Sequence, residues 1–273
     1  MRAGRIMSYR AVGLVAVLTA SVAAGPVRAD PASFGLGLEI YAAGLHALSV
    51  DAVIRIHGSR YEGEATTRTR GLLDLLFAHR GRLRSEGALL PDGVRPARHA
   101  AESRTRFGAG SVELTYRADG TVSARLDPPD EDDEPVSERL RRDTLDPLSA
   151  FLLLVRQRTP EKACRGTVRI FDGRRRYDLE FSYVGPAVLA PTSYGLYAGP
   201  ADRCRARYRR VGKDGRDRQA PPRRPPAEVW LAPLGAGGTL VPVRIDAETR
   251  WGRMVAHLVR LEPGRPEGAP ASP

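Results

Sequence analysis

The feature that most constrains the fold is a repeated alternation of apolar and polar residues with a period of two. Every second residue is apolar within residues 48–56, 112–116, 177–183 and 241–245. This period is typical of strands with one buried face. Asp172-Gly173 lies between two such runs and predicts a β-hairpin. We therefore expect roughly ten to twelve strands with turns between them.

Two segments depart from the alternation. Residues 71–77 form a short apolar patch that could make a brief helix. In the second segment, the Asp146 side chain can cap the N-terminus of a helix that begins at Pro147. Proline is tolerated there because the backbone N–H of the first helical residue has no partner within the helix. Four residues then share one face of that helix: Leu148, Phe151, Leu152 and Val155. The predicted fold class is mainly β, a curved antiparallel sheet or half-open β-barrel with this helix covering its concave side.

The N-terminus has the three parts of a secretory signal peptide. Arg2, Arg5 and Arg10 precede the apolar residues 11–24, and Val27-Arg28-Ala29 supplies small residues at a cleavage site. The alternative is an uncleaved membrane anchor. The apolar run is shorter than the ~20 residues that a spanning helix needs, which favours cleavage. We expect export to the periplasm.

The rest of the chain is expected to form one domain. Residues 1–29 are the predicted signal peptide, 30–262 a single β-rich half-barrel domain and 263–273 a disordered tail. Residues 127–135 and 213–226 are charged, rich in proline and poor in apolar residues, so we expect loops there. No segment after the signal peptide is long and apolar enough to span a membrane. Export also removes cytosolic cofactors and nucleic acid from the expected partners.

The two cysteines, Cys164 and Cys204, both follow the signal peptide. An even number of cysteines in an exported chain predicts a disulfide, because oxidising compartments form and keep such bonds. The alternative is two free thiols, one of them reactive. No C-x-x-C spacing supports redox catalysis, so a structural disulfide is favoured.

Arginine dominates the positive charge of the chain. The net charge is +11, and four of the arginines lie in the signal peptide, which leaves +7 for the remainder. One strand would place four guanidinium groups on the face opposite Cys204: Arg203, Arg205, Arg207 and Arg209. This face could contact an anionic envelope component through bidentate hydrogen bonds. The alternative is a solvated face that blocks edge pairing.

The sequence contains no recognisable catalytic or metal-binding motif. His99 and Glu102 would point to opposite faces of a strand and are expected to be a solvated surface pair. Ser149 has no evident activating group nearby and is interpreted as a serine of the first helical turn. Residues 130–134 are acidic but lack the spacing of a calcium loop. We therefore expect no catalytic residue, no metal ligand and no cofactor.

Taken in order, several segments resemble the exported bacterial domain-of-unknown-function family 3108. They are residues 38–44, 71–77, 146–150, 170–179, and 229–233 with 241–243. The resemblance covers roughly residues 36–262. The family is similar to periplasmic lipoprotein carriers and their outer-membrane receptors, which are half-open barrels with a helix-plugged apolar cavity. This resemblance implies a binding fold by analogy and supplies no catalytic residues.

Two hypotheses for function follow. The first is a non-enzymatic periplasmic binding or carrier module for an apolar or acyl-chain ligand. Its ligand would lie between the helix and the sheet, against Leu148, Phe151, Leu152 and Val155. The alternative is a structural or interaction protein of the cell envelope, with a core filled by its own side chains and the arginine-rich strand as its docking face.

Overall fold

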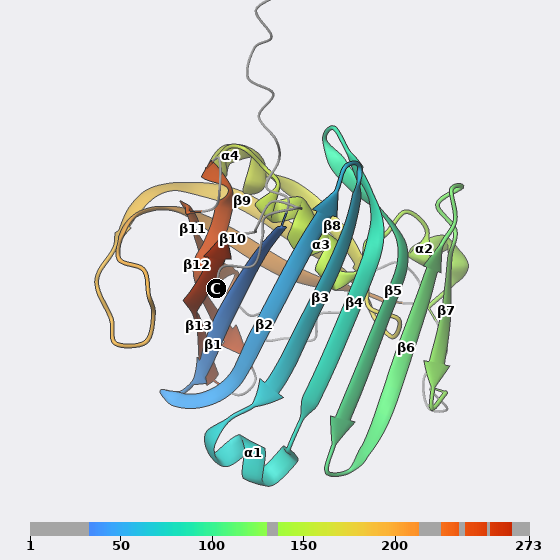
Figure 1. Ribbon diagram of the computed structural model, residues 1–273, viewed down its shortest axis with the longest axis horizontal. Helices are drawn as coiled ribbons and strands as arrows, with labels where there is room; N and C mark the ends of the chain where they lie inside the picture. Colours follow the sequence, from blue (N-terminus) through green and yellow to red (C-terminus); the bar gives the residue numbers. More distant parts are fainter. Residues whose placement is uncertain (1–32, 130–135, 213–224, 235–237, 250–251, 264–273) are drawn as a thin grey trace, which may run out of the picture.

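A computed structural model describes residues 33–129, 136–212, 225–234, 238–249 and 252–263. Within these residues, all 13 strands belong to one antiparallel sheet (Figure 1). Their order across the sheet is β7-β6-β5-β4-β3-β2-β1-β13-β12-β11-β10-β9-β8. The first and last strands of the domain, β1 and β13, pair in the middle of the sheet. The chain therefore builds one arm of the sheet outward from β1 to β7 and the other from β8 back to β13.

The strands are long and are joined mostly by short turns. Their bounds are β1 Ser33–Ala42, β2 Leu45–His57, β3 Arg60–Thr69, β4 Arg80–Leu90, β5 Gly93–Thr105, β6 Gly108–Tyr116, β7 Val122–Asp127, β8 Gly166–Phe171, β9 Arg176–Leu189, β10 Gly199–Val211, β11 Ala227–Pro233, β12 Leu240–Thr249 and β13 Gly252–Pro263. The helices are α1 Gly71–Phe77, α2 Glu138–Arg141, α3 Pro147–Val155 and α4 Pro160–Ala163.

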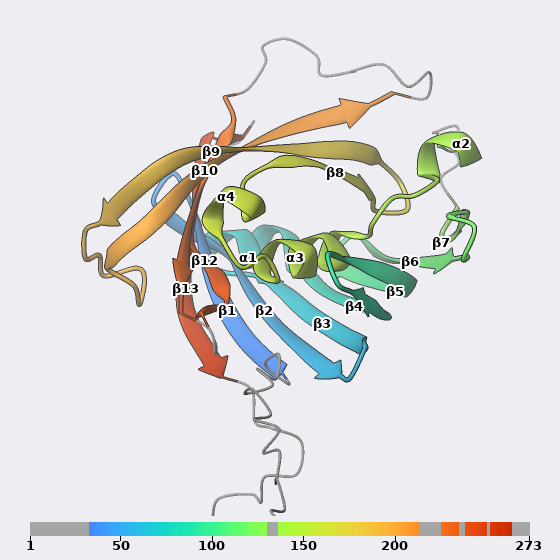
Figure 2. The same cartoon turned by 90° about the horizontal axis from the view of Figure 1, so that it is seen from above.

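The sheet curves so that its two arms face each other, with α3 and α4 between them (Figure 2). The edge strands β7 and β8 are not paired by a ladder, so the sheet does not close into a barrel. Side chains link the two edges instead, because Phe171 of β8 packs against Val112, Leu114 and Val122 of the opposite arm. Gly173, in the hairpin between β8 and β9, lies close to the same place, where a Cβ would come within 2.2 Å of Val112 Cγ1.

The main predictions about the fold are confirmed. The sheet is antiparallel, curved and half-open, and α3 lies on its concave side. Helix α1 occupies the predicted apolar patch, Gly71–Phe77. Asp172-Gly173 forms the predicted hairpin between β8 and β9, and Gly173 has φ of +95°. The sequence interpretation missed two single-turn helices, α2 and α4, because segments this short carry no periodicity.

Several predictions fall on residues outside the described ranges. These are the signal peptide 1–29, the acidic residues 130–134, most of the basic loop 213–226 and the tail beyond Pro263. The last described strand, β13, ends at Pro263, one residue beyond the predicted domain end. The domain boundaries stay a prediction.

Candidate functional site

Helix α3 is the element that the fold encloses most completely. It contacts β3, β4 and β5 of one arm and β8 and β12 of the other (Figure 2). Asp146 caps its first turn and accepts hydrogen bonds from the backbone N–H groups of Leu148 and Ser149. Pro147 occupies the first helical turn, as predicted. The concave side of the sheet is thus occupied by a nine-residue apolar helix.

The four residues predicted to face a ligand fall into two groups. Leu148, Leu152 and Val155 are 6%, 0% and 1% exposed, and they form one core cluster with the sheet. Phe151 is half-buried and packs against the edge of that cluster, as does Leu153. The amphipathic spacing therefore identified the face of α3 that binds the sheet, and Phe151 lies at the border of that face.

Gly63 of β3 allows α3 to approach the sheet closely. A Cβ at this position would lie 3.0 Å from Leu148 Cδ2 and 3.0 Å from Ile54 Cδ1. Such distances are shorter than ordinary van der Waals contacts, so the first turn of α3 would have to shift. The position of the helix thus depends on the absence of a side chain in β3.

A buried polar network fastens the start of α3 to the sheet. Asp146 is fully buried and accepts hydrogen bonds from Ser149 Oγ and, at 2.6 Å, from Ser85 Oγ of β4. His99 Nδ1 of β5 lies 3.2 Å from Asp146 Oδ1 and 2.8 Å from Ser85 Oγ. Tyr61 of β3 joins the network, with its hydroxyl 2.6 Å from Ser149 Oγ. The Asp146 carboxylate and the Ser149 hydroxyl together therefore connect three strands to the helix.

The network changes the acidity of its members. Burial alone raises the pKa of Asp146, but the hydrogen bonds from His99, Ser149 and Ser85 outweigh it and leave the pKa below its ordinary value. For Tyr61, burial and the nearby Asp146 charge raise the phenol pKa above its usual value. Asp146 is thus held as an anion and Tyr61 as a neutral hydroxyl.

The arrangement of Ser85, His99 and Asp146 differs from a nucleophilic relay. In such a relay the two ring nitrogens of histidine contact different partners, one the serine and the other the carboxylate. Here Ser85 and Asp146 both approach His99 Nδ1, and the Ser85 hydroxyl donates a hydrogen bond to Asp146. All three side chains are also buried. The geometry is that of a structural network.

Two sequence interpretations are corrected by this network. His99 was expected at the surface but is 3% exposed, because α3 and its capping residue Asp146 pack over this part of β5. The prediction that His99 and Glu102 lie on opposite faces is confirmed, since Glu102 is exposed on the outer face. Ser149 was expected to have no activating group nearby, but its Oγ donates to the Asp146 carboxylate and lies 2.6 Å from the Tyr61 hydroxyl. It does lie in the first turn of α3, as predicted.

Cys164 and Cys204 form a disulfide, as predicted. Cys164 follows α4, and Cys204 lies on the buried face of β10. The bond connects the segment after α3 to the second arm of the sheet. It lies in a small core cluster with Ala206, Val229 and Leu231.

The predicted arginine-rich strand is β10, and acidic side chains pair with most of its four predicted arginines. Arg203 and Arg205 form ion pairs with Glu228 of β11, at 3.4 and 3.0 Å. Arg209 binds Glu180 at 3.0 Å and also pairs with the buried Asp178 of β9. Arg207 is exposed. The neighbouring strands thus supply acidic partners to three of the four arginines.

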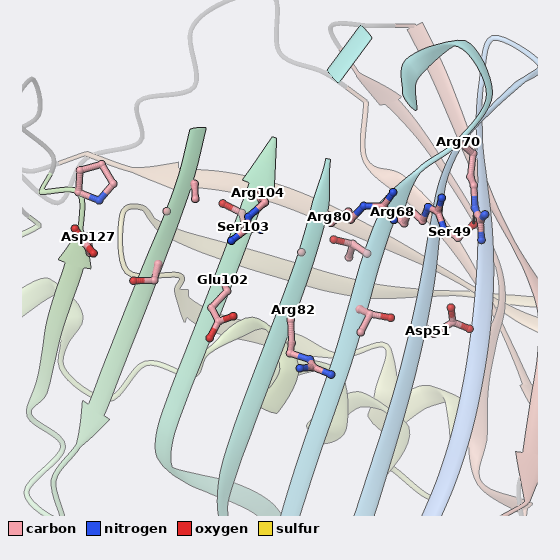
Figure 3. Close-up of a pocket in the computed structure, with 17 residues that line it drawn as sticks. Ser49, Asp51, Arg68, Arg70, Arg80, Arg82, Glu102, Ser103, Arg104 and Asp127 are labelled. Atoms are coloured by element: carbon pink, nitrogen blue, oxygen red, sulfur yellow. Dashed lines mark hydrogen bonds between the residues drawn. The ribbon is translucent and has the colours of Figure 1, made fainter. Parts of the chain in front are cut away.

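A second basic surface, which sequence reasoning missed, lies on the outer face of the other arm. It is a hollow of about 720 Å³ at the ends of β3 to β6, with Arg68, Arg80 and Arg104 among its lining residues (Figure 3). These arginines are far apart in the sequence, and only the strand register brings them together.

No helix within the described ranges is long and apolar enough to cross a membrane. The described residues also contain no cluster of three or more histidine, cysteine, aspartate or glutamate side chains that could hold a metal ion.

The comparisons with known proteins concern family and fold. The model of a family described as protein of unknown function (DUF3108) matches residues 36–259. A beta-barrel-like protein of domain of unknown function DUF1849 from Brucella abortus has a similar structure. It shares 12% sequence identity, with a TM-score of 0.45, over 85% of this chain and 97% of that chain. None of the curated proteins matches. Because the family model covers most of the sequence, this chain belongs to the DUF3108 family.

Proposed function

We propose that this protein is an exported, non-enzymatic binding module of the periplasm that carries an apolar or acyl-chain ligand on its concave side. The observation that carries the proposal is the unequal burial of α3. One face is packed against the sheet, while Phe151, Leu153 and Leu154 remain half-buried. A short helix with an apolar flank left partly open can act as a movable cover.

The concave face offers further half-buried apolar surface. Leu38 of β1, Leu189 of β9 and Leu261 of β13 are half-buried and pack at the margin of the same core cluster as Phe151. An acyl chain laid against them would remove apolar surface from water, which is worth about 25 cal/mol for each Å² buried. Binding sites for such ligands are usually concave and mainly apolar.

A non-enzymatic role is proposed because the buried group of Ser85, His99 and Asp146, the candidate relay among the described residues, lacks the geometry of one. Both Ser85 and Asp146 contact His99 Nδ1, and the group is covered by α3. We propose that it holds the helix in place. Movement of α3 as a cover would then hinge on this anchored first turn, with the later turns moving.

The test is the binding of a fluorescent fatty acid, cis-parinaric acid, to the purified protein. Wild type should bind it, and Phe151→Asp should abolish binding, because a carboxylate in an apolar site is costly unless it is paired. Val188→Asp is the control, since Val188 is 80% exposed on β9 and the variant should bind like wild type.

A second control distinguishes loss of the binding site from loss of the fold. Leu152→Ala removes a fully buried side chain and should lower stability by about 2–5 kcal/mol while leaving the half-buried flank in place. Retained binding in a folded Phe151→Asp variant would show that α3 does not cover the ligand.

A second candidate is a structural or interaction protein of the cell envelope. The close packing of Leu148, Leu152 and Val155 favours it, because these side chains already fill the space between α3 and the sheet. In that case wild type would bind no fatty acid at all. The same titration therefore separates the two candidates.

A further inference from the structure

Three outward-facing arginines form one row across three adjacent strands. Arg68 of β3 is directly opposite Arg80 of β4, and Arg80 is directly opposite Arg104 of β5. All three are exposed. Like charges placed directly opposite each other across strands are destabilising. The row therefore favours a negatively charged partner.

The row has no acidic partner among the described residues, unlike other arginines on the same face. Arg82, two residues further along β4, binds Glu64 at 2.9 Å. Arg260 binds Asp51 at 2.6 Å. No carboxylate of the described residues lies within 4 Å of the guanidinium groups of Arg68, Arg80 or Arg104. Two neighbouring arginines on this face, Arg82 and Arg260, are thus paired, whereas the described residues supply no carboxylate to the row.

The row lines the outer hollow of about 720 Å³, and Figure 3 shows Arg68 and Arg80 beside each other on adjacent strands. Arg70 also lines the hollow and donates to Ser49 Oγ at 2.6 Å. The acidic residues around it are Asp51, Glu102 and Asp127. Arg260 already engages Asp51, so the hollow keeps an excess of positive charge next to the row.

An exposed apolar rim lies directly beyond the row, at the ends of the strands. Helix α1, which joins β3 to β4, buries none of its residues. The β5–β6 hairpin adds another apolar tip, and a hydrogen bond of 3.0 Å from Arg106 N to Phe77 O joins the two. The exposed side chains of this rim are Leu72 (64%), Leu75 (67%), Leu76 (57%), Phe77 (43%) and Phe107 (77%). Figure 1 shows α1 projecting past the ends of β3 and β4.

The spacing between the row and the rim fits a lipid–water interface. Helix α1 starts three positions after Arg68, and Phe107 lies three positions after Arg104. At ~3.3 Å per residue, the rim reaches about 10 Å beyond the arginines. Apolar faces of interfacial helices lie ~5–10 Å deep in a bilayer. With the rim inserted to that depth, the arginines would be level with the phosphate groups.

We propose that the α1 rim docks this protein on the surface of an anionic phospholipid bilayer. The leucine and phenylalanine side chains insert into the apolar boundary, and Arg68, Arg80 and Arg104 bind lipid phosphates. Guanidinium groups suit this role because they bind phosphate through two parallel hydrogen bonds. The inference goes beyond the proposed function, because it concerns another face of the sheet and requires no ligand on the concave side.

The test is flotation of the protein, purified from its host cell, with vesicles of two compositions. Vesicles of phosphatidylcholine with one quarter phosphatidylglycerol should bind the protein, and vesicles of phosphatidylcholine alone should bind it far more weakly. Raising the salt concentration should release it, since exposed charges are screened. Each basic residue near an anionic surface contributes about a fivefold gain in affinity, so Arg80→Gln with Arg104→Gln should weaken binding roughly 25-fold.

Two further variants locate the contact. Leu75→Asp with Leu76→Asp should abolish binding to the anionic vesicles while the melting temperature stays near that of wild type, because both side chains are exposed. Arg205→Gln with Arg207→Gln on β10 is the matched control for lost charge and should float like wild type. Phe151→Asp should also float like wild type, which keeps this proposal separate from that of the concave site.

Three outcomes would overturn the inference. The first is equal binding to neutral and anionic vesicles. The second is that the β10 control variant loses binding while the variant with Arg80→Gln and Arg104→Gln floats like wild type. The third is complete release of the protein from the vesicles by millimolar inorganic phosphate at constant ionic strength. This result would indicate that the arginine row binds a small soluble anion.

Discussion

Replacement of Asp146 by alanine is expected to release α3 from the sheet. This carboxylate is fully buried and accepts hydrogen bonds from Ser85, Ser149 and the backbone of Leu148, with His99 within 3.2 Å. Removing it deletes the helix cap and leaves several buried donors without an acceptor. The variant should therefore lose far more stability than an ordinary cap substitution.

The magnitude follows from the contacts. Loss of an N-cap side chain costs about 1 kcal/mol. Each buried donor left unpaired costs about 1–3 kcal/mol. Ser85 and His99 can still bond each other, as can Ser149 and Tyr61, so one donor of each pair is stranded. The free energy of unfolding should therefore fall by roughly 3–7 kcal/mol, compared with a total of about 5–15 kcal/mol for a typical domain. Urea unfolding followed by circular dichroism measures the change.

Thr159→Ala is the matched control, because Thr159 caps α4 from an exposed position. It should cost about 1 kcal/mol or less. Equal losses for Asp146→Ala and Thr159→Ala would refute the reasoning, since the buried network would then contribute nothing beyond the cap.

The same residue gives a pH dependence of definite sign. The pKa of Asp146 in the folded protein lies below its ordinary value of ~3.9, so the folded state binds the proton less readily than the unfolded state. Its contribution to stability is complete above about pH 4 and is lost as the pH falls through the folded pKa. In Asp146→Asn, this part of the acid-induced decrease in stability should be absent.

Three further predictions concern other parts of the fold. Gly63→Val should lower the free energy of unfolding by about 1–3 kcal/mol, because the new side chain would overlap Leu148; an unchanged urea midpoint would contradict this. Burial and the charge of a nearby arginine lower the pKa of His257, so stability should decrease as the pH falls below about 6.5, and His257→Gln should abolish that decrease in thermal melts. Replacing Cys164 and Cys204 by serine opens a loop with a sequence separation of 40 and should cost about 4 kcal/mol in urea unfolding; an unchanged free energy of unfolding would contradict this.

The strands and α3 could be predicted because their signals are local. Alternation of apolar residues marks β2, β6, β9 and β12, and Asp146-Pro147 marks the start of the helix within two residues. The Cys164–Cys204 disulfide could also be predicted, since the chain contains no other cysteine. The concave position of α3 followed from the need to bury an apolar helix in a β protein.

The buried network could not be predicted, because strand register assembles it. Tyr61, Ser85 and His99 come from three strands, and Asp146 lies 47 residues beyond His99 in the chain. A histidine on an alternating strand gives no sign that a helix cap will cover it. The sequence interpretation therefore placed His99 at the surface.

The two basic surfaces show the same dependence on register. The arginines of β10 are conspicuous in the sequence, but their partners Glu180 and Glu228 come from the neighbouring strands. Arg68, Arg80 and Arg104 are inconspicuous in the sequence and become a row only through pairing of β3, β4 and β5. Spacing along one strand thus predicted which side chains share a face, but cross-strand neighbours determine which charges remain unpaired.

The measurement that tests the central claim most directly is mass spectrometry of lipids extracted from the protein purified from its host cell under native conditions. The account predicts acyl-chain lipid in near-stoichiometric amount with wild type and with Val188→Asp, and little or none with Phe151→Asp. Wild type without any bound acyl-chain lipid, or equal amounts in all three proteins, would contradict a ligand site beside α3.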